Sequence, residues 1–463
     1  MRPLRAFALS TATLGLASTV LAQCEPQTLE PLGMPEGGNF GRVSMDDQFL
    51  FVGNPGEPTL CPDPFDCATG ALHVFQLDAD GLWQRTQHIV PPDITLASGF
   101  GGSFSRDGDR LLVGAGGAMV DGEKSGKAYL YEYDGQQWNE VYQFVPREPR
   151  FLLGFGGSAT LRDDAALFYQ AESPGSVLLY EESSEGWVFV DEVVSPLPAS
   201  AGFGGSIAMH QQWVFIGASV DDTEVDLGGS VFVYRRVPGE GLEFVQRIIP
   251  PDIASMPRFG PAFGSTIHLD GGTLAIAGRG ADRTYENQGV IYLYELRDDR
   301  WQLTQELTHE PAGENHTLGI RMDLDGDTLI AGTEEDVWLQ TGAAYVFRRG
   351  PDGVWSQAAR IDPDGRLGRF GLGVATNGNR AAVSAPDAFF GGFSVGLVHA
   401  YDLACFDCAP DLDLDGALTI YDFLSFLNLF EDGEAAADFD GDGELTVFDF
   451  LAFQDAFQAG CPE

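Results

Sequence analysis

Short apolar strands recur along most of the chain, separated by acidic or glycine-containing turns. Each recurrence opens with Phe-Gly or Leu-Gly, followed by an alternating strand, an acidic turn and an apolar strand such as LFVGN or VFIGA. A third strand such as AYLYE or SVFVY comes next, and then a fourth strand that ends near Pro. Apolar residues at every second position mark one face of a strand, so each unit is predicted to be a four-stranded antiparallel meander.

Seven such units predict an all-β protein, a seven-bladed β-propeller. One sheet leaves two apolar faces uncovered, whereas seven sheets packed face to face around an axis cover them. We expect the Phe at each start to wedge between blades and the Gly to permit a close backbone approach. Trp opens the fourth strand in five units, at Trp83, Trp138, Trp187, Trp301 and Trp355. The units start at Phe40-Gly41, Phe100-Gly101, Phe155-Gly156, Phe203-Gly204, Phe263-Gly264, Leu318-Gly319 and Phe370-Gly371.

The two ends of the repeat array predict how the ring closes. The last unit has only three strands and finishes at VHAYDLAC, while the N-terminal segment CEPQTLEPL resembles fourth strands that end QRIIP or YQFVP. The N-terminal strand is therefore expected to complete the seventh blade. That arrangement would place Cys24 beside Cys405, where a disulfide could lock the ring.

Strings such as FGGSFSRDGDRLLVGAG and FGGSIAMHQQWVFIGA resemble FG-GAP repeats, the blades of integrin α-like propellers. The resemblance covers residues 27–403 and implies the propeller fold. Integrin-like adhesion follows only by analogy of fold. Acidic hairpins such as the one from Asp323 to Asp327 do not complete the family's calcium loop, so we interpret them as turns.

Two acidic twelve-residue segments near the C-terminus predict calcium sites. They read DLDLDGALTIYD (411–422) and DFDGDGELTVFD (438–449), with a Gly at the sixth position. Ca²⁺ takes six to eight oxygen ligands, which a bent loop of this length brings to one point. The carboxylates repel one another without a cation, so metal binding is expected to drive folding. The predicted ligands of the two Ca²⁺ ions are Asp411, Asp413, Asp415, the carbonyl of Ala417, Thr419 and Asp422, and Asp438, Asp440, Asp442, the carbonyl of Glu444, Thr446 and Asp449.

Each calcium loop runs into a predicted helix, FLSFLNLF or FLAFQDAF. This duplication, with the repeated DFLxF phrase and the ending Ala459-Gly460-Cys461, resembles the GC-type dockerin domains of Planctomycetes-like bacteria. The resemblance covers residues 405–463 and implies a small α-helical, EF-hand-like domain that docks onto a cohesin. Loop positions 10 and 11, the family's docking positions, are Ile420, Tyr421, Val447 and Phe448 here. Their apolar side chains could equally pack the small core.

The N-terminus predicts export. Arg2 and Arg5 precede an apolar stretch that ends at an A-x-A-like cleavage site after Ala22. We therefore predict a signal peptide over 1–22, the propeller over 23–404 and the calcium domain over 405–463, in a protein that is secreted or displayed at the cell surface.

Six cysteines in an exported chain suggest three disulfides, and fifteen pairings are possible. The candidate pairs are Cys24–Cys405, Cys61–Cys67 and Cys408–Cys461. The insert that holds Cys61 and Cys67 is also a candidate rim for ligand binding.

The charge of the chain excludes several classes of partner. The net charge is −43, and the only lysines are Lys124 and Lys127. Binding to nucleic acid or to anionic lipid needs clustered Lys and Arg, so neither partner is expected. No segment after the signal peptide is long and apolar enough to span a membrane.

The sequence offers no catalytic motif. The seven histidines share no position in the repeats, and no GxSxG, P-loop or dinucleotide fingerprint occurs. We predict a secreted, non-catalytic binding or structural protein, held by its calcium domain to a cohesin-like or cell-envelope partner; the ligand of the propeller is not specified. Two alternatives stay open. One is an enzyme or accessory subunit of an extracellular polysaccharide-degrading assembly, which would need a carboxylate pair about 5–9.5 Å apart; the other is a tail that serves only as a calcium-stapled sorting tag.

Overall fold

A computed structural model describes most of the chain and divides it into two compact units, Gln27–Ala400 and a second that contains Tyr401–Glu463. The predicted signal peptide lies outside the described residues, as do Cys24, Cys61, Cys67, Cys408 and Cys461. Cys405 lies in a short 3-10 helix, Leu403–Phe406, but its side chain is not described. The disulfides therefore remain predictions. The described residues are 26–31, 39–58, 69–93, 95, 97–198, 201–251, 260, 262–335, 341–363, 368–390, 393–394, 396–406, 410–412, 418–433, 437, 439 and 445–459.

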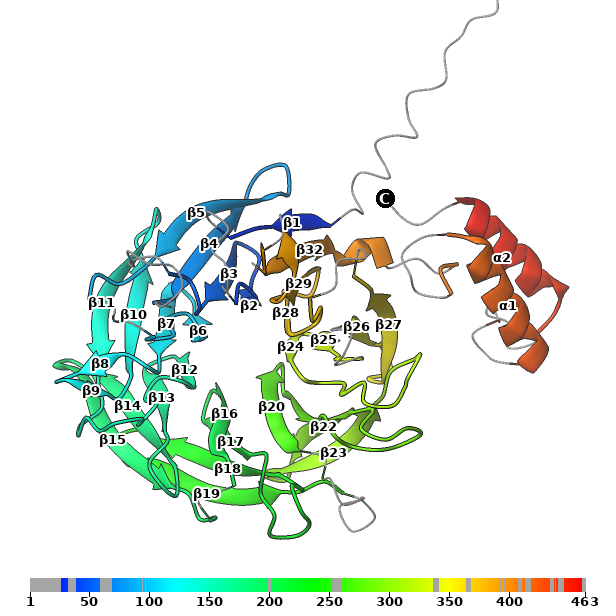
Figure 1. The fold of residues 1–463 in the computed structure, drawn as a ribbon. Coiled ribbons are helices and arrows are strands. Elements are labelled where there is room, and N and C mark those ends of the chain that lie inside the picture. The colour runs from blue at the N-terminus through cyan, green and yellow to red at the C-terminus, as the bar shows by residue number, and fades with distance from the viewer. Residues whose placement is uncertain are drawn as a thin grey trace, which may run out of the picture. The chain divides into compact units, whose positions relative to one another are not determined.

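The first unit is a ring of seven four-stranded antiparallel sheets, as predicted (Figure 1). Blade 1 contains β2 (Arg42–Met45), β3 (Phe49–Asn54), β4 (Ala71–Leu77) and β5 (Trp83–Ile89). Blade 2 contains β6 (Ser103–Asp107), β7 (Arg110–Ala115), β10 (Lys127–Tyr133) and β11 (Trp138–Phe144). Blade 3 contains β12 (Ala159–Arg162), β13 (Ala165–Gln170), β14 (Ser176–Ser183) and β15 (Gly186–Val194). Blade 4 contains β16 (Phe203–His210), β17 (Trp213–Ala218), β18 (Ser230–Val237) and β19 (Gly241–Ile248).

The remaining three blades follow the same order, with one exception at the end of the ring. Blade 5 contains β20 (Phe263–Asp270), β21 (Thr273–Gly278), β22 (Val290–Arg297) and β23 (Arg300–Leu307). Blade 6 contains β24 (Met322–Asp325), β25 (Thr328–Gly332), β26 (Ala344–Arg349) and β27 (Trp355–Ile361). Blade 7 contains β28 (Gly373–Thr376), β29 (Arg380–Ala385), β32 (Leu397–Asp402) and the N-terminal β1 (Gln27–Leu29). Two small ribbons, β8–β9 and β30–β31, cover Met119–Val120 with Glu123–Lys124 and Phe389–Phe390 with Phe393–Ser394.

The burial of each strand follows its place in the blade. The second strands are covered by a neighbouring blade on both faces, and all six residues of β3, β17 and β21 are buried. The fourth strands alternate between buried and exposed residues, because their outer face meets solvent. All seven residues that open the repeats are at most 2% exposed, which confirms that they wedge into the core: Phe40, Phe100, Phe155, Phe203, Phe263, Leu318 and Phe370.

Glycines on the second strands let adjacent blades touch through their backbones. A Cβ added to Gly114 in blade 2 would overlap the carbonyl oxygen of Gly156, the Phe-Gly glycine of blade 3. Gly217 stands in the same relation to Gly264. These positions confirm the close approach expected at the Phe-Gly glycine, and they show that it also requires a glycine one residue before the end of the second strand.

We expect Gly114→Ala to destabilise the propeller by about 3 kcal/mol, because the obstacle is backbone of the next blade that cannot turn aside. Chemical denaturation measures the change. Gly205→Ala is the matched control, because the added Cβ would lie 3.2 Å from its nearest neighbour at an exposed position. Equal losses for the two variants would contradict the backbone-contact explanation.

A glutamine on the fourth strand clamps the next blade at its tryptophan. Gln87 in blade 1 donates from Nε2 to the carbonyl of Trp138 at 2.8 Å, and its Oε1 accepts the Trp138 N–H at 2.7 Å. Gln246 makes the same pair of bonds to Trp301, at 3.1 and 2.9 Å. The two hydrogen bonds therefore fix the position of each blade relative to the next, and they use only the backbone N–H and C=O of the tryptophan.

The N-terminal strand closes the ring with the same clamp. β1 pairs antiparallel with β32, so it completes blade 7 as predicted. Gln27 then donates to the carbonyl of Trp83 in blade 1 at 2.8 Å and accepts the Trp83 N–H at 2.7 Å. Leu29 is 4% exposed and joins the core between blades 7 and 1. The first and last blades are thus joined as any other neighbours are.

The C-terminal unit contains two helices, α1 (Ile420–Asp432) and α2 (Val447–Ala459), one after each predicted calcium loop. Its core is aromatic and repeats the duplication seen in the sequence. Phe426 and Phe453 occupy equivalent places in the two helices and stack at 4.4 Å between ring centroids. No helix in the described part of the chain is long and apolar enough to cross a bilayer.

Candidate functional site

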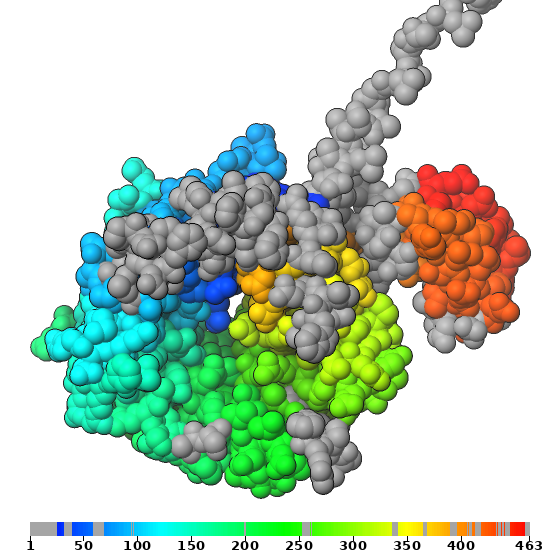
Figure 2. Space-filling model, viewed as in Figure 1, coloured from blue at the N-terminus to red at the C-terminus, as the bar shows by residue number. Residues whose placement is uncertain are grey.

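The seven inner strands enclose a central cavity of about 380 Å³ (Figure 2). Small polar side chains line it, and some of them hold neighbouring blades together; Ser103 Oγ donates to the carbonyl of Gly156 at 2.7 Å. Arg42 and Arg321 also line the cavity. Burial and then the charge of Arg321 lower the pKa of Arg42 to about 10. Asp270 and Asp323 line the cavity as well, so side chains of both charges face it.

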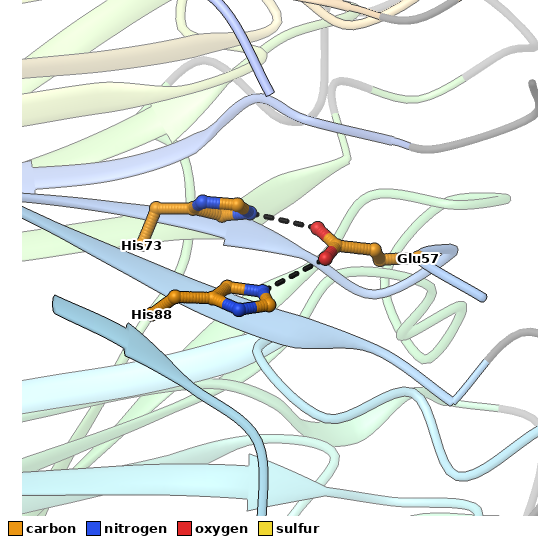
Figure 3. Close-up of side chains that lie close together, drawn as sticks. All are labelled: Glu57, His73 and His88. Atoms are coloured by element: carbon orange, nitrogen blue, oxygen red, sulfur yellow. Dashed lines mark hydrogen bonds and ion pairs between the residues drawn. The ribbon is translucent and has the colours of Figure 1, made fainter. Parts of the chain in front are cut away.

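A more defined cluster lies in blade 1, where Glu57, His73 and His88 meet (Figure 3). His73 on β4 and His88 on β5 are directly opposite each other in the ladder. Their rings lie 4.7 Å apart between centroids at an angle of 36°. Glu57, in the segment after β3, presents one carboxylate oxygen to each ring: Nε2 of His73 is 2.7 Å from Oε2, and Nε2 of His88 is 2.8 Å from Oε1.

The surrounding residues hold the carboxylate in place. Asn54 Nδ2 donates to Oε2 of Glu57 at 2.8 Å, and the backbone carbonyl of Glu57 accepts bonds from the N–H groups of Thr69 and Gly70. The side chain of His73 is fully buried and that of Glu57 is 5% exposed, whereas that of His88 is 24% exposed. The cluster is therefore reached from solvent past His88.

The electrostatics of the cluster favour a neutral His73 and an ionised Glu57. Burial lowers the pKa of His73, and the nearby charges of His88 and Arg85 lower it further, although Glu57 acts in the opposite direction. Burial alone would raise the pKa of Glu57, but the hydrogen bonds from His73 and His88 outweigh it and hold that pKa well below its usual range. A neutral imidazole and a carboxylate are the forms in which these side chains ligate metals.

A second histidine pair lies in the segment between β23 of blade 5 and β24 of blade 6, and it is arranged differently. His309 Nε2 is 3.0 Å from His316 Nδ1, and burial, followed by the charges of His316 and Arg360, lowers the pKa of His309 to about 3. The nearby Glu335 is occupied by Arg360, whose Nη2 lies 3.1 Å from Oε2. A guanidinium therefore stands where blade 1 has an imidazole.

The blade 1 cluster was missed in the sequence because the histidines appeared scattered. Counted back from the β4–β5 turn, a regular ladder would place His73 opposite Gln87. A register shift between Val74 and Phe75 instead brings it opposite His88. The position of Glu57 depends on the fold of a loop, for which the sequence carries no periodic signal.

The predicted calcium loops are described only in part. Asp411, Thr419 and Asp422 of the first loop, and Thr446 and Asp449 of the second, lie within the described residues. The other predicted ligands lie outside them: Asp413, Asp415, Ala417, Asp438, Asp440, Asp442 and Glu444.

The described ends of the loops are fixed by hydrogen bonds to the last aspartate. Asp422 accepts the N–H of Leu412 at 2.8 Å with one oxygen and the N–H of Thr419 at 2.7 Å with the other. The first and twelfth positions of the loop are thereby drawn together. Asp449 repeats the second contact, accepting the Thr446 N–H at 2.7 Å.

The two threonines also begin the helices. Thr419 is the N-cap of α1 and accepts the Tyr421 N–H at 3.1 Å, and Thr446 accepts the Phe448 N–H at 3.1 Å. Together with Asp422 or Asp449, each forms a capping arrangement that satisfies free N–H groups of the first turn. Both threonines were predicted as metal ligands, and their role as helix caps was not predicted.

The donors fit calcium. Asp411, Asp422 and Asp449 are at most 1% exposed. The segment 401–463 contains sixteen Asp and Glu residues and no Lys, Arg or His, so no side chain of this segment carries a positive charge. Burying ionised carboxylates is costly unless a cation compensates them. Two Ca²⁺ ions, held by the aspartates of the loops, would supply that charge.

An apolar surface follows each loop, in two equivalent copies. Ile420 and Tyr421 at the start of α1 are each 64% exposed, and Val447 and Phe448 at the start of α2 are 64% and 63% exposed. Leu424 and Leu451, one turn further on, are 47% and 46% exposed. The sequence left open whether the first four side chains pack the core, and the structure places them outside it. We refer to these six residues as the paired apolar surface.

Comparison with protein-family models supports the repeat in one part of the chain. No curated protein matches the sequence. Among solved structures, a putative 6-phosphogluconolactonase from Bacteroides uniformis is similar at 10% identity and a TM-score of 0.49, with 73% of this chain and 89% of that chain covered. A chain of the mitotic checkpoint complex is similar at 10% identity and a TM-score of 0.47, with 86% and 99% covered. Residues 83–131, from the fourth strand of blade 1 to the third strand of blade 2, match the FG-GAP repeat.

Proposed function

We propose that this protein is a secreted, non-catalytic binding or structural propeller that is displayed or assembled outside the cell through its C-terminal unit. The unit is a dockerin-like module that folds around two Ca²⁺ ions and docks onto a cohesin-like or cell-envelope protein. The paired apolar surface carries the proposal, because six exposed apolar side chains in so small and acidic a unit need a partner to cover them.

The duplication of the surface supports docking. Ile420, Tyr421 and Leu424 follow the first loop at the same spacing as Val447, Phe448 and Leu451 follow the second. Aromatic and aliphatic side chains of this kind provide the anchors of stable interfaces. Each triplet sits directly beside a loop that needs calcium, so removal of the metal is expected to disorder the surface.

We expect Tyr421→Ser combined with Phe448→Ser to abolish capture of the partner without unfolding the chain, because both side chains are largely exposed. The full-length protein is the bait, incubated with the envelope and secreted fractions of the source organism in calcium or in EDTA. The wild type should retain one partner in calcium and release it in EDTA. Truncation of an anchor at the centre of an interface costs about 2 kcal/mol or more, so each of the two substitutions should weaken binding by about 30-fold.

The matched control is Tyr285→Ser, which removes a partly exposed aromatic side chain from the propeller and leaves the paired apolar surface unchanged. It should capture the partner as the wild type does. Capture that persists in the double variant or in EDTA would contradict the proposal, as would a chain that captures nothing under any condition.

A further inference from the structure

We propose that Glu57, His73 and His88 form a binding site in blade 1 for one divalent transition-metal ion, of which Zn²⁺ suits the donors best. The donor atoms of the three side chains lie within 4.8 Å of one another and come from three separate segments of the blade. Two imidazoles and one carboxylate are a common ligand set for such ions. The site is distinct from the calcium loops, and nothing in it depends on the function proposed above.

The geometry needs only a small adjustment to admit the ion. Metal–nitrogen and metal–oxygen bonds of about 2.0–2.2 Å at tetrahedral angles place neighbouring donor atoms about 3.3 Å apart. The carboxylate oxygens of Glu57 are now 2.7 and 2.8 Å from the two Nε2 atoms. Opening these contacts by about half an ångström would seat the ion between the groups that already face it, as Figure 3 shows.

Other blades show what a purely structural contact at this place looks like. In blade 6, Arg360 on the fourth strand lies opposite Tyr345 on the third and pairs with Glu335 of the preceding loop at 3.1 Å. In blade 4, Arg247 lies opposite Phe232 and pairs with Asp221 at 2.5 Å. The ion pair fastens the loop to the outer strand in both blades.

Blade 1 has a carboxylate at the same place, that of Glu57, but differs from blades 4 and 6 at the aromatic and the arginine positions. His73 replaces the aromatic residue of the third strand, and His88 replaces the arginine of the fourth. A guanidinium has no lone pair to offer a metal, whereas an imidazole does. A contact that served only to fasten the loop would be satisfied by arginine, as in blades 4 and 6. The two replacements together turn the same position into a ligand set.

Two neighbouring features limit the affinity. Binding through Nε2 moves the ring proton of His73 to Nδ1, which is buried and has no hydrogen-bond partner among the described residues. Arg85 also places a positive charge near the site. A missing partner for a ligating histidine typically weakens metal binding by 10–100-fold. We therefore expect a dissociation constant of about 1 µM and not the much tighter binding of structural zinc sites.

Zn²⁺ titrated calorimetrically into the oxidised full-length protein tests the site, with excess Ca²⁺ present to fill the acidic loops. We expect one additional equivalent of Zn²⁺ to bind. His88→Arg should weaken this binding by about 100-fold or more, because it removes one of three ligands. The substitution reproduces the carboxylate–guanidinium pair of blade 6, so the blade should stay folded and its denaturation midpoint in EDTA should not fall. His210→Gln, in blade 4, is the matched control and should bind as the wild type does.

Diffraction at the zinc edge provides an independent readout. An anomalous peak about 2.1 Å from Nε2 of His73, Nε2 of His88 and a carboxylate oxygen of Glu57 would support the proposal. Failure of the wild type to bind Zn²⁺ in excess Ca²⁺, or equal binding by His88→Arg, would overturn it. The proposal would fall equally if the anomalous peak appeared only at the C-terminal loops.

Discussion

Chelation of calcium is expected to unfold the C-terminal unit and to leave the propeller intact. Asp411, Asp422 and Asp449 are buried, and the segment 401–463 to which they belong has no basic side chain. At a free calcium concentration 100 times the dissociation constant, each ion would stabilise the folded state by about 2.7 kcal/mol. Two ions thus supply about 5 kcal/mol, which is comparable with the whole stability of a domain of this size.

Hydrogen exchange of the full-length protein measures the effect in both units at once. In calcium, amides of α1 and α2 should be protected, and in EGTA they should lose about 100-fold or more of their protection. Amides of the buried second strands, β17 for example, should be unchanged and serve as the internal control. Protection of both helices in EGTA would show that the aromatic core around Phe426 and Phe453 suffices without metal.

Removal of the N-terminal strand is expected to destabilise the propeller more than any single substitution described above. A chain that lacks residues 23–31 loses the pairing of β1 with β32, the clamp of Gln27 on Trp83 and the buried side chain of Leu29. Loss of a buried leucine side chain costs about 2–5 kcal/mol, and each hydrogen bond about 1 kcal/mol. The truncation should therefore cost about 5 kcal/mol or more and expose β32 as an open edge.

Denaturant unfolding of the truncated and the full-length mature chain tests this expectation, and light scattering should show association through the open edge. Two single substitutions separate the clamp from the rest of the strand. Gln27→Ala and Gln246→Ala should each cost about 1–2 kcal/mol, since both remove the same pair of hydrogen bonds to a tryptophan backbone. Unchanged stability after the truncation would mean that six complete blades and a three-stranded seventh hold the ring unaided.

Most of the fold could be predicted from the sequence because the same pattern recurs in every blade. The Phe-Gly starts, the apolar second strands and the tryptophans all have the places that the sequence predicts. Even the closure of the ring was visible, since QTL at the N-terminus has the glutamine and apolar spacing of the fourth strands QHI and QRI. The glutamine clamp itself was not predicted, because its partner is the backbone of another blade.

The cluster of Glu57, His73 and His88 in blade 1 could not be predicted from the sequence. The register shift between Val74 and Phe75 places His73 opposite His88 and not opposite Gln87. The extra residue of such a bulge cannot be located by counting back from the turn in the sequence. Glu57 reaches the two rings through the shape of a loop held by Asn54 and Thr69. A comparison of equivalent positions, in which His73 and His88 stand against aromatic and arginine residues of other blades, could have drawn attention to the pair.

The prediction of the calcium loops rests on spacing alone, since aspartates at fixed intervals around a glycine are a strong pattern. The exposure of Ile420, Tyr421, Val447 and Phe448 was not settled by that pattern. An apolar side chain at a helix start packs inward or outward according to how the two helices cross, and the stacked pair Phe426 and Phe453 decides this.

Calcium binding to the full-length protein, measured by calorimetry, tests the central claim most directly. The account predicts two ions per chain, with one site lost in Asp411→Ala and the other in Asp438→Ala, and with Asp455→Ala unchanged. Binding of no calcium, or of two ions in all three variants, would contradict the assignment of the C-terminal unit as a calcium-dependent module and, with it, the proposed mode of display.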